Sequence, residues 1–236
     1  MAARPERFME STVKKIVLEL GADLCGLAHI ESFSQAPPGF HPADIFSRCR
    51  SVVVLAKRLP RGAGEVNPRI VYNRANDLNI LEVDRLAYLS ALAIENLGAT
   101  AVPLPSDSPY DYWDEAKSRG RGVLSMRHSA VLAGLGRLGR STLVLNRQFG
   151  NMLTLGAVLT DLDLKSDPPA EELCPDNCGL CLKACPSRAL DGTTVDQQRC
   201  RPHTYGVNAR GFGVVNCNLC RTGCPLSLGV RPGPAS

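Results

Sequence analysis

The chain has 236 residues, of which 44% are hydrophobic and 21% are charged, and its formal net charge is +4. This length suits one medium domain with a small appendage, and the apolar fraction suffices for a hydrophobic core. The charge is mild and spread along the chain, so by itself it does not indicate nucleic-acid or membrane-surface binding. The N-terminal residues lack the uninterrupted apolar run of a signal peptide, and no stretch approaches the length of a membrane span. We therefore expect a soluble cytoplasmic protein with no membrane or nucleic-acid partner.

Helical and strand patterns alternate through the first two-thirds of the chain. The elements predicted there are, in order, a helix over 8–20, strands over 22–30 and 51–59, a helix over 76–97, a strand over 99–105, a polar loop over 106–122, a short helix over 128–136, and strands over 141–146 and 151–160. Mixed elements of this kind predict an α+β fold built on an α/β domain.

The composition changes near residue 168, where KSDPPAEE forms a polar linker that contains two prolines. Eight of the ten cysteines follow it, whereas Cys25 and Cys49 stand alone in the first part. We therefore expect two domains, 1–167 and 168–236. The second has no regular apolar period, so bound metal has to supply the stability that a small core lacks.

The cysteines form two runs, CPDNCGLCLKACP and CNLCRTGCP, with one further cysteine upstream of the second run. Bacterial ferredoxins bind two clusters with the spacing C-x2-C-x2-C-x3-C-P, in which the fourth cysteine of each run ligates the other cluster. This pattern predicts two [4Fe–4S] clusters and therefore electron transfer. The predicted ligands are Cys174, Cys178, Cys181 and Cys224 for one cluster, and Cys185, Cys200, Cys217 and Cys220 for the other.

Two features depart from the ferredoxin spacing. The first gap of the first run is three residues long, and sixteen residues separate Cys200 from Cys217. The alternative is a pair of four-cysteine zinc sites, but zinc ribbons favour separated CxxC pairs and need neither a third cysteine nor a following proline. The spacing favours iron–sulfur clusters. We expect Cys25 and Cys49 to be small buried residues outside both sites.

The segment GLGRLG at 134–139 matches the pattern GxGxxG. A dinucleotide-binding fingerprint follows a strand and opens a helix. Here a helical pattern precedes the glycines and a strand pattern follows them. The glycines therefore favour a close approach of the backbone to another bulky ligand.

The long segment HSAVLAGLGRLGRSTLVLNRQFGNMLTLGAVLTDLDL, together with the cysteine runs, resembles the epoxyqueuosine reductases and their relatives, the reductive dehalogenases. The resemblance implies a nitroreductase-like domain that holds a corrinoid (cobalamin) and a C-terminal ferredoxin-like module with two [4Fe–4S] clusters. It also implies a soluble electron donor of the ferredoxin or flavodoxin type. The residues expected to bind the corrinoid are Gly134, Gly136, Gly139, Arg140, Ser141 and Thr142.

The chain also departs from the family pattern. Arg137 and Arg140 replace an aromatic residue and a lysine in the glycine motif, and the nearest candidate for the catalytic acid is Asp107 in PSDSP. Asp107 and the aromatic residues after it either line the mouth of a pocket or form a solvated loop. We expect no helical-repeat domain after Cys224, and therefore no tRNA substrate.

Three functions remain open from the sequence. The first is a cluster-dependent reductase with a corrinoid in the N-terminal domain. The second is a non-catalytic protein that transfers electrons to a corrinoid partner, or activates that partner reductively. The third is a reductase that uses FMN, a common ligand of nitroreductase-like folds. In the first of these functions, the cofactor carries out the difficult chemistry. In the second, the N-terminal domain docks the partner and binds no cofactor.

Overall fold

The computed structural model describes residues 6–66 and 70–230, so the outer ends of both expected domains, 1–5 and 231–236, lie outside the described residues. The elements of the first part are α1 (Glu6–Glu19), β1 (Leu24–His29), η1 (Ile30–Phe33), α2 (Pro42–Ile45), β2 (Ser51–Arg58), η2 (Arg61–Gly64), α3 (Ile70–Glu95), β3 (Ala101–Leu104), β4 (Tyr112–Asp114), β5 (Arg119–Arg121), α4 (Met126–Leu132), β6 (Arg137–Leu138), β7 (Val144–Leu145) and β8 (Leu153–Thr160). The elements of the second part are α5 (Leu180–Ala184), α6 (Gln197–Thr204), β9 (Tyr205–Val207), β10 (Gly213–Val215) and α7 (Leu219–Thr222).

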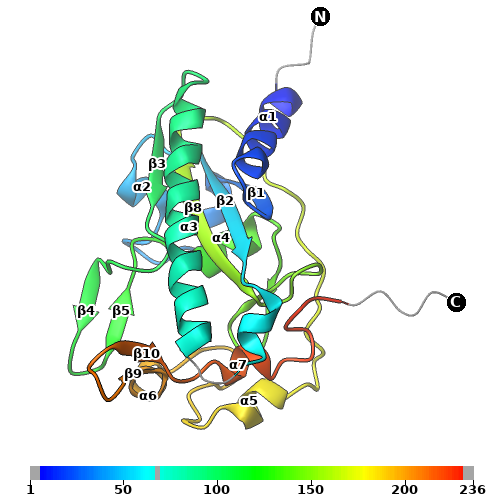
Figure 1. Cartoon of the computed structure of the whole chain (residues 1–236). Helices are drawn as coiled ribbons and strands as arrows, with labels where there is room; N and C mark the ends of the chain where they lie inside the picture. The colour runs from blue at the N-terminus through cyan, green and yellow to red at the C-terminus, as the bar shows by residue number, and fades with distance from the viewer. Residues whose placement is uncertain (1–5, 67–69, 231–236) are drawn as a thin grey trace, which may run out of the picture.

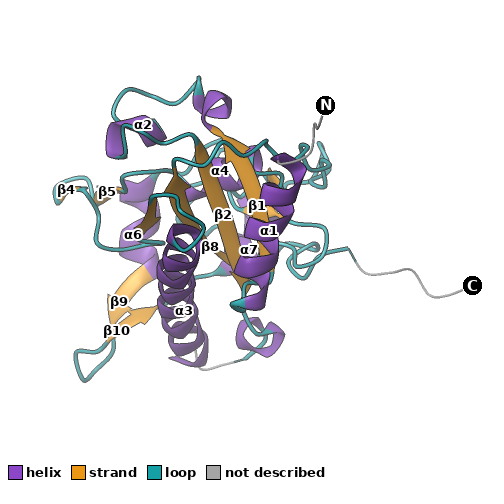
Figure 2. Cartoon of the chain, turned by 90° about the horizontal axis from the view of Figure 1, so that it is seen from above, coloured by secondary structure: helices purple, strands orange, loops and turns teal. Residues whose placement is uncertain are grey.

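A four-stranded sheet with the order β1-β2-β8-β3 forms the centre of the molecule (Figures 1 and 2). All three strand pairings in it are antiparallel. The mixed helix-and-strand fold predicted from the sequence is confirmed, and the antiparallel pairing makes it an α+β arrangement.

Both faces of this sheet are covered. Along β2, Val53 and Leu55 pack with α1 and α3, while Val52 and Val54 pack with α4 on the opposite face. Because successive strand residues point to opposite faces, a strand covered on both sides is apolar throughout. This explains the continuous run SVVVLA.

Several elements differ from their predicted extents. The helix α3 begins at Ile70, six residues before the predicted start. The predicted polar loop contains the β4–β5 hairpin. The predicted strand 141–146 shrinks to β7 because residues 139–142 form a turn, in which Thr142 N–H donates to Gly139 O at 2.8 Å and Thr142 has a φ of 63°.

The cysteine-bearing segment lies beneath the lower end of α3 in Figure 1, where α5, α6 and α7 gather. Within its described residues, 169–230, the only buried hydrophobic side chains are Cys181 and Ala189. The segment thus has almost no apolar core of its own, as expected for one that metal stabilises. The linker before it is fixed to the first part, since the Asp167 carboxylate accepts from Lys14 Nζ at 2.8 Å and from Leu27 N–H at 2.9 Å.

Within 6–66 and 70–230, no helix is both long enough and apolar enough to cross a membrane.

Candidate functional site

The eight clustered cysteines form two groups of four, each around its own small cavity. The first group, set A, comprises Cys174, Cys178, Cys181 and Cys224. The second group, set B, comprises Cys185, Cys200, Cys217 and Cys220, and its cavity measures about 90 Å³. Contacts between α5 and α7 hold the two runs together. The fold therefore brings together the same two groups that the ferredoxin spacing predicts, while their role as ligands stays a prediction.

Each set of four thiols surrounds a cavity, as the ligands of a cubane cluster do. In the described part of the chain, no group of three or more His, Cys, Asp or Glu side chains is placed to hold a single metal ion. The preference for iron–sulfur clusters over zinc therefore stays a prediction from the cysteine spacing.

The two remaining cysteines lie in the hydrophobic core. Cys25 packs on the α1–α3 face of the sheet and Cys49 on the α4 face. Burial raises the pKa of Cys25 to about 12 and that of Cys49 to about 11, so both thiols stay protonated at neutral pH. They are structural residues, as the sequence indicates.

The glycine-containing loop 134–142 lies between the central sheet and the cysteine-bearing segment. Gly139, Arg140 and Ser141 border the set A cavity, and Ser141 also borders the set B cavity together with Thr142. Arg140 Nη1 donates to Asp176 O at 2.7 Å, which fastens the first cysteine loop. Four of the six residues predicted to bind a corrinoid thus border the cavities of the cysteine sets.

The glycines themselves allow close packing within the protein. A Cβ at Gly136 would lie 2.3 Å from Leu145 O, and one at Gly134, whose φ is +70°, would lie 2.4 Å from Pro168 O. A Cβ at Gly139 would lie 2.8 Å from Leu145 Cδ1. The bulky neighbour that the glycine pattern indicates is therefore, in this structure, the chain's own backbone and side chains.

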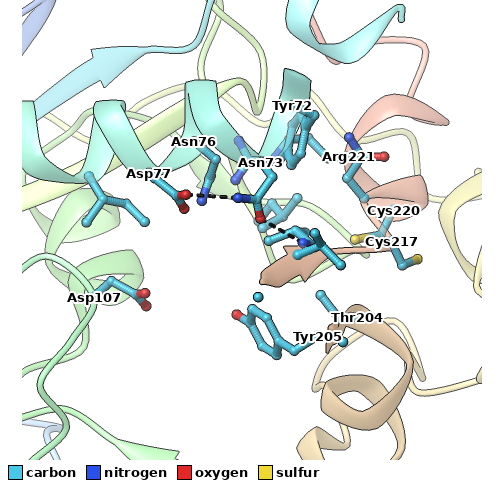
Figure 3. Close-up of a pocket in the computed structure, with 17 residues that line it drawn as sticks. Tyr72, Asn73, Asn76, Asp77, Asp107, Thr204, Tyr205, Cys217, Cys220 and Arg221 are labelled. Atoms are coloured by element: carbon cyan, nitrogen blue, oxygen red, sulfur yellow. Dashed lines mark hydrogen bonds between the residues drawn. The ribbon is translucent and has the colours of Figure 1, made fainter. Parts of the chain in front are cut away.

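A large cavity of about 450 Å³ opens between α3 and the β9–β10 hairpin (Figure 3). Its volume lies in the range of small-molecule sites. Cys217 and Cys220 of set B border it, and Asp107 faces it from the opposite side. On the α3 side, Asn73 donates to Asp77 Oδ2 at 2.9 Å and accepts from Val215 N–H at 2.7 Å, which ties α3 to β10.

Asp107, the predicted catalytic acid, thus belongs to the wall of the large cavity. Its Oδ1 accepts from the Tyr110 hydroxyl at 3.4 Å. Tyr110 stacks on Trp113 at 5.8 Å between ring centroids, and the Arg201 guanidinium lies 4.9 and 5.0 Å from the two rings. Because Arg201 follows Cys200 in α6, this contact fixes the loop of Asp107 to set B.

A second cavity of about 130 Å³ adjoins the large one and shares Leu143 and Arg221 with it. Arg127 also borders this second cavity, and it borders the set B cavity as well. Partial desolvation lowers the pKa of its guanidinium, the charge of Arg221 lowers it further, and the Cys220 thiol opposes the shift.

Sequence reasoning missed Arg221 and the wall residues on α3. Arg221 directly follows the second cysteine of the CNLC segment, and this adjacency to a predicted ligand was the available signal. Nothing in the sequence marks Asn73 or Asp77, because they approach the cysteines only through the packing of α3 on β10.

No protein-family model matches the chain. Among curated proteins it is similar to epoxyqueuosine reductases. It is 31% identical to that of Gloeobacter violaceus over 137 residues, which cover 49% of this chain and 42% of the relative. It is 26% identical to that of Bacillus anthracis over 211 residues, which cover 80% of this chain and 51% of the relative. The chain therefore spans about half the length, or less, of these relatives.

Solved structures show the same fold. The epoxyqueuosine reductase of Bacillus subtilis matches 94% of this chain and 66% of its own with a TM-score of 0.67 at 19% identity. A catabolic reductive dehalogenase in complex with 3-bromo-4-hydroxybenzoic acid matches 95% of this chain and 32% of its own with a TM-score of 0.70 at 19% identity. The resemblance predicted from the sequence, to epoxyqueuosine reductases and reductive dehalogenases, is confirmed.

Proposed function

We propose that this chain is an iron–sulfur oxidoreductase that passes electrons from a soluble donor, through two [4Fe–4S] clusters, to a corrinoid bound in the large cavity. One observation carries the proposal: Cys217 and Cys220 belong both to set B and to the wall of that cavity. A cluster held by set B would therefore lie beside any molecule bound there. Set A borders no part of the large cavity and is the entry side for electrons from a donor of the ferredoxin or flavodoxin type.

The fold supports a corrinoid as the acceptor. One solved structure with the same fold, at a TM-score of 0.68, is a reductive dehalogenase described as B12-dependent. A bound corrinoid would supply one-electron redox chemistry at a metal, which amino-acid side chains lack. The loop 134–142 then acts mainly as the support on which the cysteine cavities are built.

The residues of the chain orient the acceptor and supply a proton. Asp107 faces the cavity opposite Cys217 and Cys220, so a bound molecule lies between the electron source and this carboxyl group (Figure 3). A positioned carboxylic acid next to a molecule that gains electrons serves as a general acid. Tyr110 holds the carboxyl group by its hydrogen bond and is itself fixed by Arg201. We expect tRNA not to be the substrate, since the net charge is only +4.

A second function is favoured by the β9–β10 hairpin, whose residues 205–206 and 213–215 line the same cavity. Val207 and Phe212, on the β9–β10 hairpin, are 72% and 63% exposed. Exposed apolar side chains beside a redox site are typical of a docking surface. In this alternative, the chain transfers electrons to a corrinoid carried by a partner protein.

The test is titration of anaerobically reconstituted protein with cobalamin and, separately, with FMN, followed by visible absorption. Saturable cobalamin binding is expected, and reduced ferredoxin should then reduce the bound cobalamin. Cys220→Ser should slow this reduction at least tenfold, whereas the matched variant Cys49→Ser, at a buried cysteine outside both sets, should not. Saturable FMN binding instead would support a flavin reductase, and binding of neither ligand would support the electron-transfer alternative.

A further inference from the structure

The helix α3 carries apolar side chains on two opposite faces. Toward the sheet, buried residues such as Val83, Leu86 and Ile94 pack in the core. The outward face, which lies in front of the sheet in Figure 1 and at the outer edge of the molecule in Figure 2, is also largely apolar. Its apolar residues, which are between 42% and 61% exposed, are Val71, Leu78, Leu81, Tyr88 and Leu92. A helix that is apolar all round is normally covered on all sides, so this outward face fits a binding partner.

The exposed positions have the spacing of a coiled-coil seam. Together with the exposed Arg74, Arg85 and Glu95, the five apolar residues follow one another at alternating intervals of three and four. We call these eight residues the α3 stripe. This spacing keeps side chains along one line that a second helix can pack against. With 26 residues, α3 is about 39 Å long, which gives such a contact several turns.

The charges of the α3 stripe favour an antiparallel copy of the same helix. Arg74 lies near its beginning and Glu95 at its end. In a parallel pair of identical helices, each of these charges would face its own like, which is unfavourable. In an antiparallel pair, each Arg74 comes close to the Glu95 of the other copy, and residues 78–81 face residues 88–92. The α3 stripe is therefore self-complementary, as a two-fold symmetric interface requires.

Arg85 would lie near the two-fold axis of such a pair, where the two copies of this residue approach each other. Its charge is offset within each chain, since its Nε and Nη2 both donate to the Glu82 carboxylate at 2.9 Å. The centre of the antiparallel pair thus contains two ion pairs between apolar segments.

We propose that the chain forms a symmetric dimer in which the α3 stripe packs against the α3 stripe of a second copy, with the two helices antiparallel. This inference goes beyond the proposed function and does not depend on it. The large cavity uses other residues of α3, among them Asn73 and Asp77, so changes in the stripe leave its wall intact.

The test is sedimentation velocity of the anaerobically reconstituted full chain at several concentrations between about 1 and 100 µM. We expect a mass of about 51 kDa, twice the 25.4 kDa of one chain. Leu81→Glu, at the most exposed apolar position of the stripe, should raise the dissociation constant at least tenfold, because it places a charge in the apolar contact. The matched control is Leu18→Glu, at an exposed leucine of α1, which should remain dimeric.

Charge reversal tests the antiparallel arrangement. Arg74→Glu alone and Glu95→Arg alone should each weaken the dimer about threefold or more, because each places like charges together. The double variant restores opposite charges and should recover the affinity of the unaltered chain. A change that merely disturbs the helix would not be rescued in this way.

A single-chain mass for the unaltered protein over the whole concentration range would overturn the proposal and leave the α3 stripe to a partner of another sequence. A dimer that Leu18→Glu disrupts and Leu81→Glu does not would place the interface on another face, and would overturn it as well. Absence of rescue in the double variant would refute the antiparallel pairing. Melting temperature and iron content show whether each variant is folded, and Tyr88→Glu provides the same test at a second exposed position if Leu81→Glu is not.

Discussion

The substitution Gly136→Ala tests whether the glycine loop packs against the protein or contacts the cofactor. A Cβ at this position would lie 2.3 Å from the backbone oxygen of Leu145 and 2.8 Å from Val144 Cγ1. The obstacle is largely backbone, within the β6–β7 pairing of residues 137–138 with 144–145. The clash can be relieved only if the backbone of the β6–β7 pair shifts. Overpacking of this kind costs about 1–3 kcal/mol of stability. For a chain of this size, a loss of about 3 kcal/mol lowers the melting temperature by about 6–12 °C.

The assay is thermal unfolding of reconstituted Gly136→Ala with and without cobalamin, beside Gly62→Ala. Gly62 lies in η2 with open space around its Cβ position, so its variant should melt within about 1 °C of the unaltered chain. If Gly136→Ala melts like Gly62→Ala but loses cobalamin binding, the packing explanation is wrong and the glycine contacts the cofactor.

The remaining predictions concern the cysteines and the linker. Cys200→Ser should lose most of one cluster, while Cys25→Ser and Cys49→Ser keep their iron; full iron and sulfide in the Cys200 variant would refute the set B assignment. Burial raises the pKa of Cys25 to about 12 from an ordinary 9.0, so only the unfolded state loses this proton as pH rises between those values. The free energy of unfolding should then fall by at most about 1.4 kcal/mol per pH unit in that window, and chemical denaturation of Cys25→Ala should show a smaller fall. Removal of metal by chelation under oxidising conditions, followed by limited proteolysis, should leave a fragment that ends near Asp167; uniform resistance of the whole chain would contradict the metal-dependent stability of the second segment.

Much of the fold follows from local patterns in the sequence. The apolar run of β2 predicts a strand, and the leucine period predicts α3 except for its first six residues. The cysteine grouping was predictable for a different reason: cluster geometry constrains the spacing, so the crossing of Cys185 and Cys224 between the runs can be inferred without a structure. Pairing of short strands such as β4 and β5 depends on tertiary contacts, which the polar sequence does not reveal.

The rest of the site depends on residues that come together only in the folded chain. Arg127 precedes the glycine loop and Arg221 lies within the last cysteine run, and no sequence period relates the two. The glycine spacing predicts a close approach but does not identify the neighbour, which is the backbone of Leu145 at Gly136. Asp107 was singled out from its loop, yet its position opposite Cys217 results from the packing of the Tyr110 loop on α6.

The central claim, that the two cysteine sets hold iron–sulfur clusters, is tested most directly by metal and acid-labile sulfide analysis of the anaerobically purified and reconstituted chain. Two four-cysteine sets around separate cavities predict about eight iron and about eight sulfide atoms per chain. About two zinc atoms per chain with no sulfide would contradict the account.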